Sequence, residues 1–408
     1  MLCTYLRHVV YAAARGLALL NVVVCALLLS GCSQANYQFN TVKIGLVAPL
    51  SGENFSEGYR WLYAARQAIA DWNAAASSKP YRIELVAYDE TEGAAVARRL
   101  TLDPDVLGVV GHWDPAIALE AESEYRKVGL PLLAVGIADP ALTAESPPQV
   151  FRLTPPAGAL GRGVGVFLAQ QLHPSAVAVV AGPALSDLAM GDALRQGATA
   201  ADLRVARVEA VQQYSTDYRG VLERLEVVAP QAVLYSGAAA EAQSFLGQYL
   251  RYQGWRQPPP VILAPNAGSP DVLREAPRPS HNVYWISGGG DPRATKAGTA
   301  FWAAYQRRWN QSPSPLAAVV YDGTNLLLQG IESALASPTT DHRQQVSTFL
   351  RQGVLYRGVA REYSFDGRGK LVNPRAYVYR LDGGSFPGDL AAEIGIEASA
   401  DQSGPLRR

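Results

Sequence analysis

From residue 42 onward, the chain alternates between short apolar runs and longer segments in which apolar residues recur at helical spacing. Runs of this kind are typical of buried strands, and the helical spacing is typical of amphipathic helices. The first strands are predicted at 42–47, 81–88, 106–110 and 130–135. The helices between them are predicted at 58–76, 93–102 and 115–128. This repeated strand–helix order predicts an α/β protein with a doubly wound parallel sheet.

A second series of the same kind follows. Its strands are predicted at 176–181, 203–208, 232–235 and 260–264. Its helices are predicted at 157–172, 187–201, 216–228 and 239–253, with a further strand at 283–287 and helices at 293–310 and 316–336. Two α/β units of similar size predict two lobes. Ligands bind beyond the carboxyl ends of strands in open parallel sheets, so we expect the binding site in a cleft between the lobes.

The N-terminus has the order of segments found in secretory signals. Arg7, His8 and Arg15 precede an apolar run at 17–29, which is shorter than the roughly 20 residues that span a bilayer. The run ends in Leu29-Ser30-Gly31-Cys32, which resembles the lipobox of bacterial lipoproteins. The resemblance implies a signal peptide at 1–31, a lipid on Cys32 and a tether at 32–41. An ordinary signal peptide or an uncleaved anchor is the alternative.

Composition excludes several classes of protein. Lys plus Arg and Asp plus Glu both number 36, and no basic tract suits nucleic acid. A chain cut before Cys32 keeps that cysteine alone, which leaves no disulfide, thiolate catalyst or zinc–cysteine site. The five histidines have no metal-ligand spacing, and neither a GxSxG motif nor a P-loop is present. We therefore expect a protein that is not an enzyme and has no metal or cofactor.

Several segments, in order, carry a family resemblance. They include VKIGLVAPLSG, ARQAIADWN, YRIELVAYDE, VFRLTP, YSTDYRGVLERL, LAAVVYDGTNLL and REYSFDGRGKL. Together they run from about residue 42 to about residue 381, and they resemble the leucine/isoleucine/valine-binding proteins of ABC transporters. No single segment is diagnostic, but the ordered set identifies the chain as a member of that family.

The resemblance implies the type I periplasmic-binding fold, in which two doubly wound lobes are joined by a three-strand hinge. The crossings would fall near 151–155, 283–288 and 362–366. Lobe 1 would comprise 42–152 plus 286–362, lobe 2 would comprise 155–283 plus 364–382, and 383–408 would form a tail. Hinge closure around a solute would be the mechanism of capture.

The residues that hold an amino acid in this family are not matched here. Two donors to the ligand carboxylate, a serine after the third strand and a threonine after the fourth, correspond to Pro115 and Ala138. Two aromatic residues of the second lobe correspond to Ser186 and Ala238. The carboxylate that meets the ligand ammonium has no clear counterpart, and Asn266 is the nearest polar residue. We therefore expect a pocket remodelled for another small polar solute.

The predicted lining of this pocket is Glu57, His112, Trp113, Asp114, Pro115, Gly136, Ala138, Ser186, Asp187, Ala238 and Asn266. Glu57, which replaces an apolar wall residue, and Asp114 would favour a cationic, amide or hydroxyl-bearing ligand if both face the cleft. Local structural roles remain open for most of these residues. Trp113 can cover the sheet edge, and His112 can stabilise its loop. Asp114, Ser186 and Asp187 can cap helices, while Glu57 suits a first helical turn.

The sequence thus predicts a solute-binding lipoprotein of the cell envelope, facing the periplasm or the exterior. Its partners would be an amino-acid-like or amide-like solute, ABC permease and ATPase subunits, and a membrane reached through the lipid. The family resemblance implies a monomer. A ligand sensor of the same fold without transport is the alternative, and a surface hydrolase lacks a nucleophile–base pair.

Overall fold

The computed structural model describes residues 40–75, 79–136, 149–212, 215–270, 272, 282–338, 340–353, 355–381 and 386–396. Asn40 and residues 80–82 form a small unit of their own, in which the Asn40 amide donates to the Pro80 carbonyl at 3.3 Å. The rest of the description concerns the remaining unit, which carries both large sheets.

The first sheet has the strand order β2-β1-β3-β4-β5. Its strands are β1 (Asn40–Ala48), β2 (Tyr81–Asp89), β3 (Val106–Gly111), β4 (Leu132–Ala134) and β5 (Val150–Arg152). The pairs β1–β3, β3–β4 and β4–β5 are parallel. The helices of this half are α2 (Phe55–Ala75), α3 (Ala94–Leu102) and α4 (Pro115–Lys127), with the 3₁₀ turn η1 (Glu90–Glu92).

The second sheet has the order β14-β13-β10-β9-β8-β6-β7. Its parallel strands are β6 (Ala176–Ala181), β7 (Arg204–Ala210), β8 (Ala232–Ser236), β9 (Val261–Leu263) and β10 (Val283–Ser287). The antiparallel strands are β13 (Arg375–Arg380) and β14 (Asp389–Gly395). Its helices are α5 (Ala157–Phe167), α6 (Leu185–Ala200), α7 (Arg219–Val228) and α8 (Ala239–Arg251).

The parallel strands of the two sheets share one arrangement. In each sheet the first strand in the sequence lies between the second and the third, so both follow the order 2-1-3-4-5. Such a sheet has a topological switch point, where the connections from the first and third strands leave in opposite directions. The switch points lie beyond the carboxyl ends of β1 and β3 and of β6 and β8. This result confirms the predicted α/β class with doubly wound parallel sheets.

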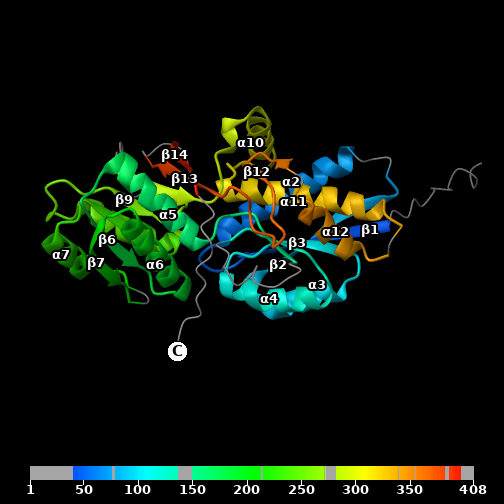
Figure 1. Cartoon of the computed structure of the whole chain (residues 1–408), viewed down its shortest axis with the longest axis horizontal. Helices are drawn as coiled ribbons and strands as arrows, with labels where there is room; N and C mark the ends of the chain where they lie inside the picture. The colour runs from blue at the N-terminus through cyan, green and yellow to red at the C-terminus, as the bar shows by residue number, and fades with distance from the viewer. Residues whose placement is uncertain are drawn as a thin grey trace, which may run out of the picture. The chain divides into compact units, whose positions relative to one another are not determined.

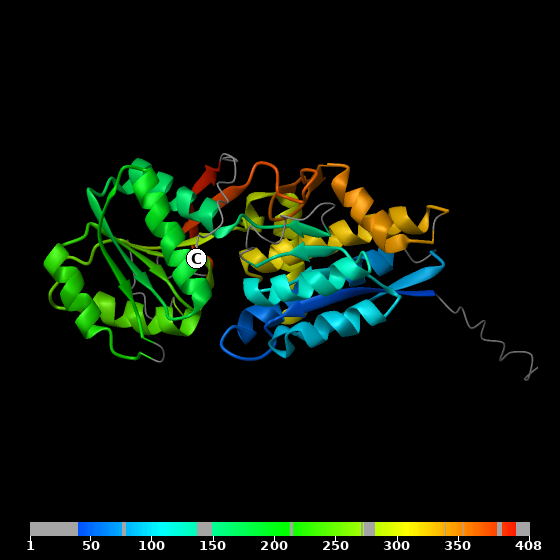
Figure 2. The ribbon, with the colours of Figure 1, turned by 60° about the horizontal axis from the view of Figure 1, so that its bottom comes forward.

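Helices cover both faces of each sheet (Figures 1 and 2). The alternation of side chains along β8 shows how the second sheet is buried on both faces, because successive strand residues point to opposite sides. Val233 and Tyr235 pack with residues of α7 and α8, whereas Ala232 and Leu234 pack with residues of α5 and α6. A strand buried in this way reads as a continuous apolar run, which is the pattern that the sequence shows.

The chain returns to the first sheet after β10. The turn η5 (Pro292–Ala294) and the helices α10 (Lys296–Trp309), α11 (Pro315–Leu335) and α12 (His342–Arg351) follow. α11 packs against α2 and β3, and α12 packs against α11 and β3. The short strands β11 (Tyr356–Arg357) and β12 (Glu362–Tyr363) form a separate antiparallel pair.

A buried carboxyl group on α11 fixes the segment that leads back toward β13. Asp322 is 0% exposed and accepts hydrogen bonds from the amides of Val359 (2.7 Å) and Ala360 (2.8 Å) and from the Tyr363 hydroxyl (3.1 Å). Burial raises the pKa of Asp322 to about 7, although these donors oppose the shift. Asp322 therefore joins α11 to the returning segment, because all three of these hydrogen-bond donors belong to that segment.

Most predicted elements are confirmed, with ends that differ by a few residues. The helix predicted at 157–172 ends as α-helix at Phe167 and continues as a π-helical segment, Leu168–Leu172. The strands β5 and β13, the helix α12 and the pair β11–β12 were not predicted. Residues assigned to the C-terminal tail form β14 instead, because Ile394 and Ile396 bury against the α5–α6 face of the second sheet. Ile394 and Ile396 stand in a largely polar segment, so the apolar residues there do not form a recognisable strand pattern.

Glycines allow α5 and α6 to contact each other through their backbones. A Cβ on Gly161 would lie 2.1 Å from the Ala193 carbonyl oxygen, and one on Gly165 would lie 2.1 Å from that of Gly197. Conversely, a Cβ on Gly197 would lie 1.9 Å from the Gly161 carbonyl oxygen. The glycine-rich stretch at 161–165 is thus explained by helix packing, not by a phosphate-binding loop.

The substitution Gly161→Ala should therefore lower the free energy of unfolding by about 1–3 kcal/mol or more, because the added methyl overpacks the helix contact. Gly158→Ala is the matched control on the same helix, because only the flexible end of Arg162 lies near that position, at 3.9 Å. It should change the stability by less than about 1 kcal/mol. Urea unfolding of the two variants measures the difference, and equal effects would contradict the proposed packing.

Candidate ligand-binding site

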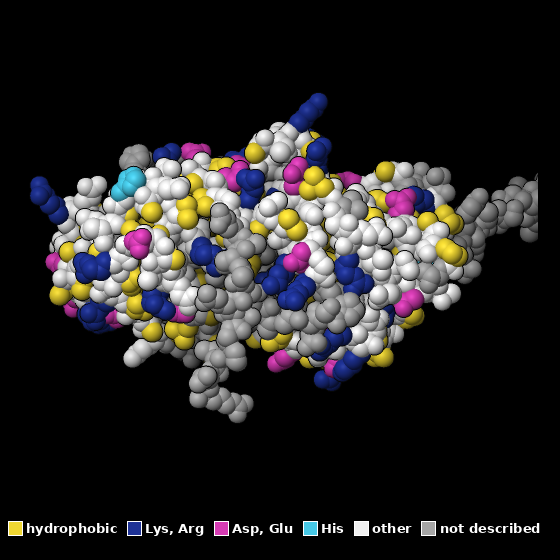
Figure 3. All heavy atoms as spheres, viewed as in Figure 1, with side chains coloured by type: hydrophobic (Ala, Val, Ile, Leu, Met, Phe, Trp, Pro, Cys, Tyr) yellow, Lys and Arg dark blue, Asp and Glu magenta, His cyan; other side chains and the backbone are white. Residues whose placement is uncertain are grey.

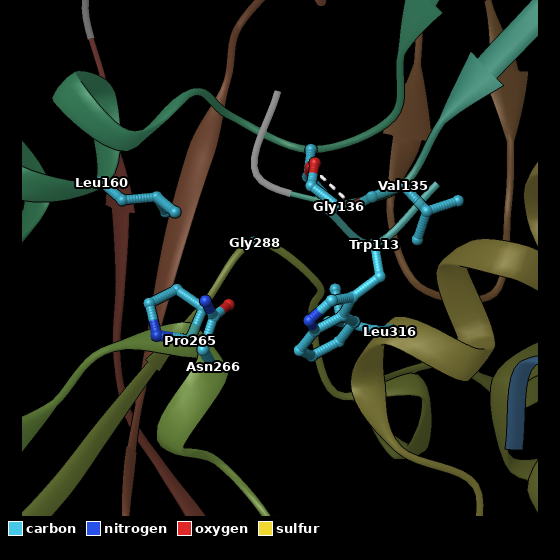
Figure 4. Close-up of a pocket in the computed structure, with 9 residues that line it drawn as sticks. Trp113, Val135, Gly136, Leu160, Pro265, Asn266, Gly288 and Leu316 are labelled. Atoms are coloured by element: carbon cyan, nitrogen blue, oxygen red, sulfur yellow. Dashed lines mark hydrogen bonds between the residues drawn. The ribbon is translucent and has the colours of Figure 1, made fainter. Parts of the chain in front are cut away.

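The loops that follow the strands of both sheets line one pocket (Figure 4). The empty space between its lining atoms, counted with the solvent at its open mouth, is about 300 Å³. Its lining residues are Trp113, Val135, Gly136, Thr154, Leu160, Pro265, Asn266, Gly288 and Leu316. Trp113 follows β3, Gly136 follows β4, Thr154 follows β5, and Asn266 follows β9. The pocket thus lies beyond the carboxyl ends of strands from both sheets, and Trp113 places it beside the switch point of the first sheet.

A second hollow, of about 480 Å³ when the solvent at its open mouth is counted, shares Trp113 and Asn266 with the first. Its other lining residues are Glu53, Asn54, Ser56, Glu57, Arg60, Ala239, Ala240, Gln243, Gly268 and Ser269. Because two residues belong to both linings, the two hollows are neighbouring parts of one cleft. The first part is mostly apolar, and the second contains most of the charged side chains.

Trp113 is the aromatic residue of the cleft, and its position is fixed from two directions. In Figure 4 its indole lies beside Leu316 and faces Pro265 and Asn266 across the pocket. The ring packs against Trp61, with 5.6 Å between the ring centroids. The Trp113 amide donates to Glu90 Oε2 at 2.7 Å, so the backbone is held as well.

Glu90 positions the whole turn after β3, and the sequence analysis did not select it. It is 3% exposed, and it accepts hydrogen bonds from the amides of Trp113 and Asp114, the second at 3.3 Å. Burial raises the pKa of Glu90 to about 7 against the opposing effect of these two donors. The sequence does not indicate this role, because Glu90 follows Asp89 and an Asp-Glu pair at a strand end is usually solvated.

His112 is not part of the pocket lining. Its side chain is 0% exposed, and its Nε2 lies 3.1 Å from the Tyr125 hydroxyl. Burial lowers the pKa of His112 to about 3, so the ring is neutral at physiological pH. Its Nδ1 lies 4.0 Å from Glu90 Oε2. These contacts fit the alternative that the sequence leaves open for His112, which is to stabilise its loop.

Asp114 and Pro115 begin α4. The Asp114 carboxylate accepts from the amides of Ala116 (2.7 Å) and Ile117 (3.1 Å), and Pro115 occupies the first helical position. This is a helix cap of the ordinary kind, in which proline replaces an amide that would have no partner. Neither residue belongs to the lining of the two hollows.

Glu57 lines the second hollow but is already bound by neighbouring groups. Its carboxylate accepts from Trp61 Nε1 at 3.1 Å and lies 3.3 Å from Arg60 Nη1. It also accepts from the Ser314 hydroxyl at the start of α11. The charge of Glu57 is therefore balanced by the protein, and it joins α2 to α11.

The predicted residues of the second sheet lie at two helix starts. Ser186 and the buried Asp187 are in the first turn of α6, and Ala238 precedes α8. The Ser236 hydroxyl donates to the Asp187 carbonyl at 2.8 Å. None of the three residues appears in the lining of the two hollows, although Ala239 and Ala240 do.

Of the predicted residues, Trp113, Gly136 and Asn266 line the first pocket together, and Glu57 joins the second hollow. Ala138 and Cys32 lie outside the described residues. The sequence pattern did not indicate Thr154 or Leu316, which lies at the start of α11. The Thr154 hydroxyl shares its one hydrogen between the carbonyls of Val135 (2.9 Å) and Gly136 (3.0 Å). The position of Thr154 just after a strand was the available signal, but β5 was too short to be recognised.

The part of the chain that the structure describes holds no cluster of His, Cys, Asp and Glu suited to a metal ion. Within the same residues, no helix is both long and apolar enough to cross a membrane. On the face shown in Figure 3, basic and acidic side chains are interspersed.

Comparison with known proteins gives one family. Residues 41–385 match the family model described as periplasmic binding protein. An amino acid binding protein of Pseudomonas aeruginosa is 25% identical over 270 residues, which cover 64% of this chain and 70% of that protein. The Leu/Ile/Val-binding protein of Escherichia coli strain K12 is 23% identical over 232 residues, which cover 55% of this chain and 62% of that relative, less than two thirds of its length.

Solved structures share the fold at low sequence identity. The branched-chain amino acid transporter substrate binding protein LivJ from Streptococcus pneumoniae, in complex with isoleucine, superposes with a TM-score of 0.74. It is 21% identical, and the match covers 88% of this chain and 99% of that one. A solute binding protein of an ABC transporter from R. palustris, in complex with benzoate, gives a TM-score of 0.71 at 15% identity, covering 88% and 96%.

The pH dependence of stability should reveal the buried charge of Glu90. A carboxyl whose pKa is raised in the folded state stabilises the fold most when it is protonated, and this contribution is lost as the pH rises from about 4.5 to about 7. Relative to a Glu90→Gln variant, the wild type should therefore lose up to about 3 kcal/mol between pH 5 and pH 8, because one pKa unit corresponds to about 1.4 kcal/mol.

Urea unfolding at the two pH values measures this difference. Glu92→Gln is the control, because Glu92 is an exposed acid two residues away that pairs with Arg99. The difference in stability between Glu92→Gln and the wild type should change much less between the two pH values. A stability difference between the wild type and Glu90→Gln that is the same at both pH values would contradict the assignment.

Proposed function

The chain belongs to the periplasmic binding protein family, and we propose that it is an extracytoplasmic lipoprotein that binds a small polar solute and delivers it to an ABC permease. The family is that of the leucine/isoleucine/valine-binding proteins, as the sequence predicts, and it places the protein outside the cytoplasm. Two of its relatives are named as binding proteins for amino acids. The identity of the solute, its delivery and the lipid anchor are the parts that we propose.

One observation carries the proposal. The pocket around Trp113 is lined from both sheets at once, by residues that follow β3, β4, β5, β9 and β10. A solute in this position contacts both halves of the chain, so its binding favours the arrangement in which the two sets of loops are close together. A permease can then distinguish a loaded protein from an empty one.

The composition of the cleft argues against an aliphatic amino acid as the solute. Pro115 starts a helix where the family resemblance implies a serine donor, and the single hydrogen of the Thr154 hydroxyl is already used on the carbonyls of Val135 and Gly136. A buried ligand carboxylate needs hydrogen-bond donors, which in this cleft would have to come from other lining residues such as Asn266 and Gln243. The ligand is therefore proposed to be a polar solute other than leucine, and a role as a sensor remains the alternative to transport.

We propose two lobes, each formed by two parts of the chain. The chain crosses from one lobe to the other after β5, after β10 and before β13. The proposed lobes are 42–152 plus 286–362 and 155–283 plus 364–382, and β14 belongs with the second because it pairs with β13. The assignment is supported by the packing of α11 and α12 on β3, which returns residues after β10 to the first sheet. Residues near Gly288 and Thr154 would then absorb the closing motion.

A thermal-shift screen of the purified full-length protein tests the proposed binding. Solutes from the classes of amides, amines, amino acids, nucleosides and small acids are offered one at a time. A true ligand at 100 times its Kd adds about 2.7 kcal/mol to the stability, which raises Tm by several degrees. A variant Trp113→Ala should lose this response, whereas Trp255→Ala, altered away from the pocket, should keep it. No shift with any solute would contradict the proposal.

The lipid anchor is tested separately. In cells fed a labelled fatty acid, the protein should carry the label and sediment with membranes, because several acyl chains hold a protein on a bilayer for long times. Cys32→Ser should abolish the label, and Cys25→Ser should retain it, because Cys25 lies in the proposed signal peptide. Labelling that survives in Cys32→Ser would contradict lipidation at Cys32.

A further inference from the structure

A wide groove lies apart from the ligand-binding cleft. Its empty space is about 1400 Å³ when the solvent at its open mouth is counted. It is lined by the turn after β10, the start of α10, the segment that contains β11 and β12, and parts of β13 and β14. None of its lining residues belongs to the two hollows of the cleft. We call it the crossing groove, because the second and third proposed crossings border it.

The charges in and beside the crossing groove are paired, with one exception. Three short ion pairs balance one another: Arg357–Glu362 (3.2 Å), Arg375–Glu393 (2.8 Å) and Arg293–Asp291 (2.8 Å). Arg361 also lines the groove, but it forms no ion pair with any carboxylate in the part of the chain that the structure describes. The groove therefore has one cation that its own acidic side chains leave over.

The guanidinium of Arg361 is buried, and only part of its hydrogen-bonding capacity is used. The residue is 9% exposed; Nε donates to the Glu362 carbonyl at 3.4 Å, and Nη2 donates to the Asn373 carbonyl at 3.2 Å. Nη1 is buried without a hydrogen-bond partner among the described groups. The charge of Arg361 acts on Asp322, but that carboxyl is already bound by three other donors. Of the five N–H groups of a guanidinium, those of Nη1 and one of Nη2 are left for an acceptor.

A second donor without a described partner lines the same groove. Tyr377, on β13, is 5% exposed, and its hydroxyl makes no hydrogen bond to any group that the structure describes. Burial raises the pKa of Tyr377, and the charge of Arg361 opposes this shift, so the hydroxyl lies within the field of the guanidinium. Buried donors without acceptors are rare because each costs stability. Arg361 and Tyr377 together therefore point to an acceptor that the described residues do not supply.

The wall of the crossing groove includes an apolar part. Leu355, Val372 and Leu390 belong to its lining and are 39–52% exposed. They come from three separate segments of the chain: the loop before β11, the loop before β13, and β14. Large apolar side chains that stay exposed in a concave surface are typical of a binding site. An apolar wall beside a single unpaired cation is complementary to a molecule with an apolar body and one negative charge.

We propose that the crossing groove is a second binding site, for a small amphipathic carboxylate. Its head group would accept hydrogen bonds from Arg361 and Tyr377, and its apolar body would lie against Leu355, Val372 and Leu390. The two oxygens of a carboxylate match the paired N–H groups of Nη1 and Nη2. A group with two negative charges, such as phosphate, fits less well, because only one cation is left over and the paired acids would repel the second charge.

Arg361 also has a structural role. Its two hydrogen bonds to carbonyls tie the segment before β12 to the loop before β13, and its guanidinium lies 5.8 Å from the centre of the Tyr363 ring. This role alone, with a water molecule at Nη1, predicts that Arg361→Gln lowers Tm and that no carboxylate binds. Tyr377→Phe removes a hydroxyl that has no described partner, and Leu355→Ser changes an exposed side chain. Both of these variants should therefore keep nearly the Tm of the wild type.

Isothermal titration of the full-length protein with octanoate, acetate and octylamine tests the site. Octanoate should bind. Acetate has the same charge without the chain, and it should bind at least about tenfold more weakly, because each buried methylene strengthens binding about fourfold. Octylamine has the same chain with the opposite charge, and it should also bind at least about tenfold more weakly than octanoate, because it cannot accept from a guanidinium.

Variants locate the octanoate site. Arg361→Gln should weaken octanoate at least about tenfold, and Tyr377→Phe and Leu355→Ser should each weaken it several-fold. Arg368→Gln and Leu102→Ser are the matched controls, because both residues are exposed and neither lines the groove. These two controls should leave the Kd of octanoate unchanged.

Each alternative gives a different result. A protein that does not bind octanoate has no such site. Octanoate binding that is equally tight in Arg361→Gln, Tyr377→Phe and Leu355→Ser overturns its placement in the crossing groove, as does binding that is lost in Trp113→Ala, which alters the cleft. Octylamine that binds as tightly as octanoate overturns the anionic head group, and acetate that does so overturns the apolar wall. None of these results bears on the solute of the cleft, which the thermal-shift screen tests.

Discussion

The order in which the parallel strands pair is the constraint on which the rest of the structure depends. In both sheets the first strand lies between the second and the third, so the connections after the first and third strands diverge to opposite faces. This divergence leaves a space at the carboxyl edge of each sheet. Trp113 and Glu53 lie at one of these edges, and Asp187 and Glu241 lie at the other. The cleft is therefore a consequence of topology, and its chemistry is decided by a few loop residues.

Those residues divide into two groups by the partners that they have. Glu57, Asp114 and His112 are engaged by α2, α4 and Tyr125, so they stabilise the loops that form the site. Asp187 and Glu241 lie in the first turns of α6 and α8, where negative charge suits the helix dipole, and Glu241 accepts from the Ala238 amide at 3.3 Å. An acidic side chain at a strand end thus does not by itself indicate a contact with a ligand. Its role depends on whether the surrounding loops balance its charge.

Sequence patterns predicted the repeated strands and helices because strands buried on both faces are long apolar runs, as at β6 and β8. They did not predict β5 or β14, because a three-residue strand and a strand with one buried position have little periodicity. The resemblance located the pocket near Trp113 and Asn266 by alignment. It could not locate Glu90, because the role of Glu90 arises from its hydrogen bond to the turn after β3, 23 residues further along the chain.

The central claim is that one solute site is formed by strand-end loops of both sheets together. Hydrogen–deuterium exchange, with and without a solute that stabilises the protein, tests this claim most directly. We predict slower exchange at 113–117 and 154–160 together with 237–241 and 265–268, all with the same dependence on solute concentration. Slower exchange at the loops of one sheet alone, or at none of these segments, would contradict it.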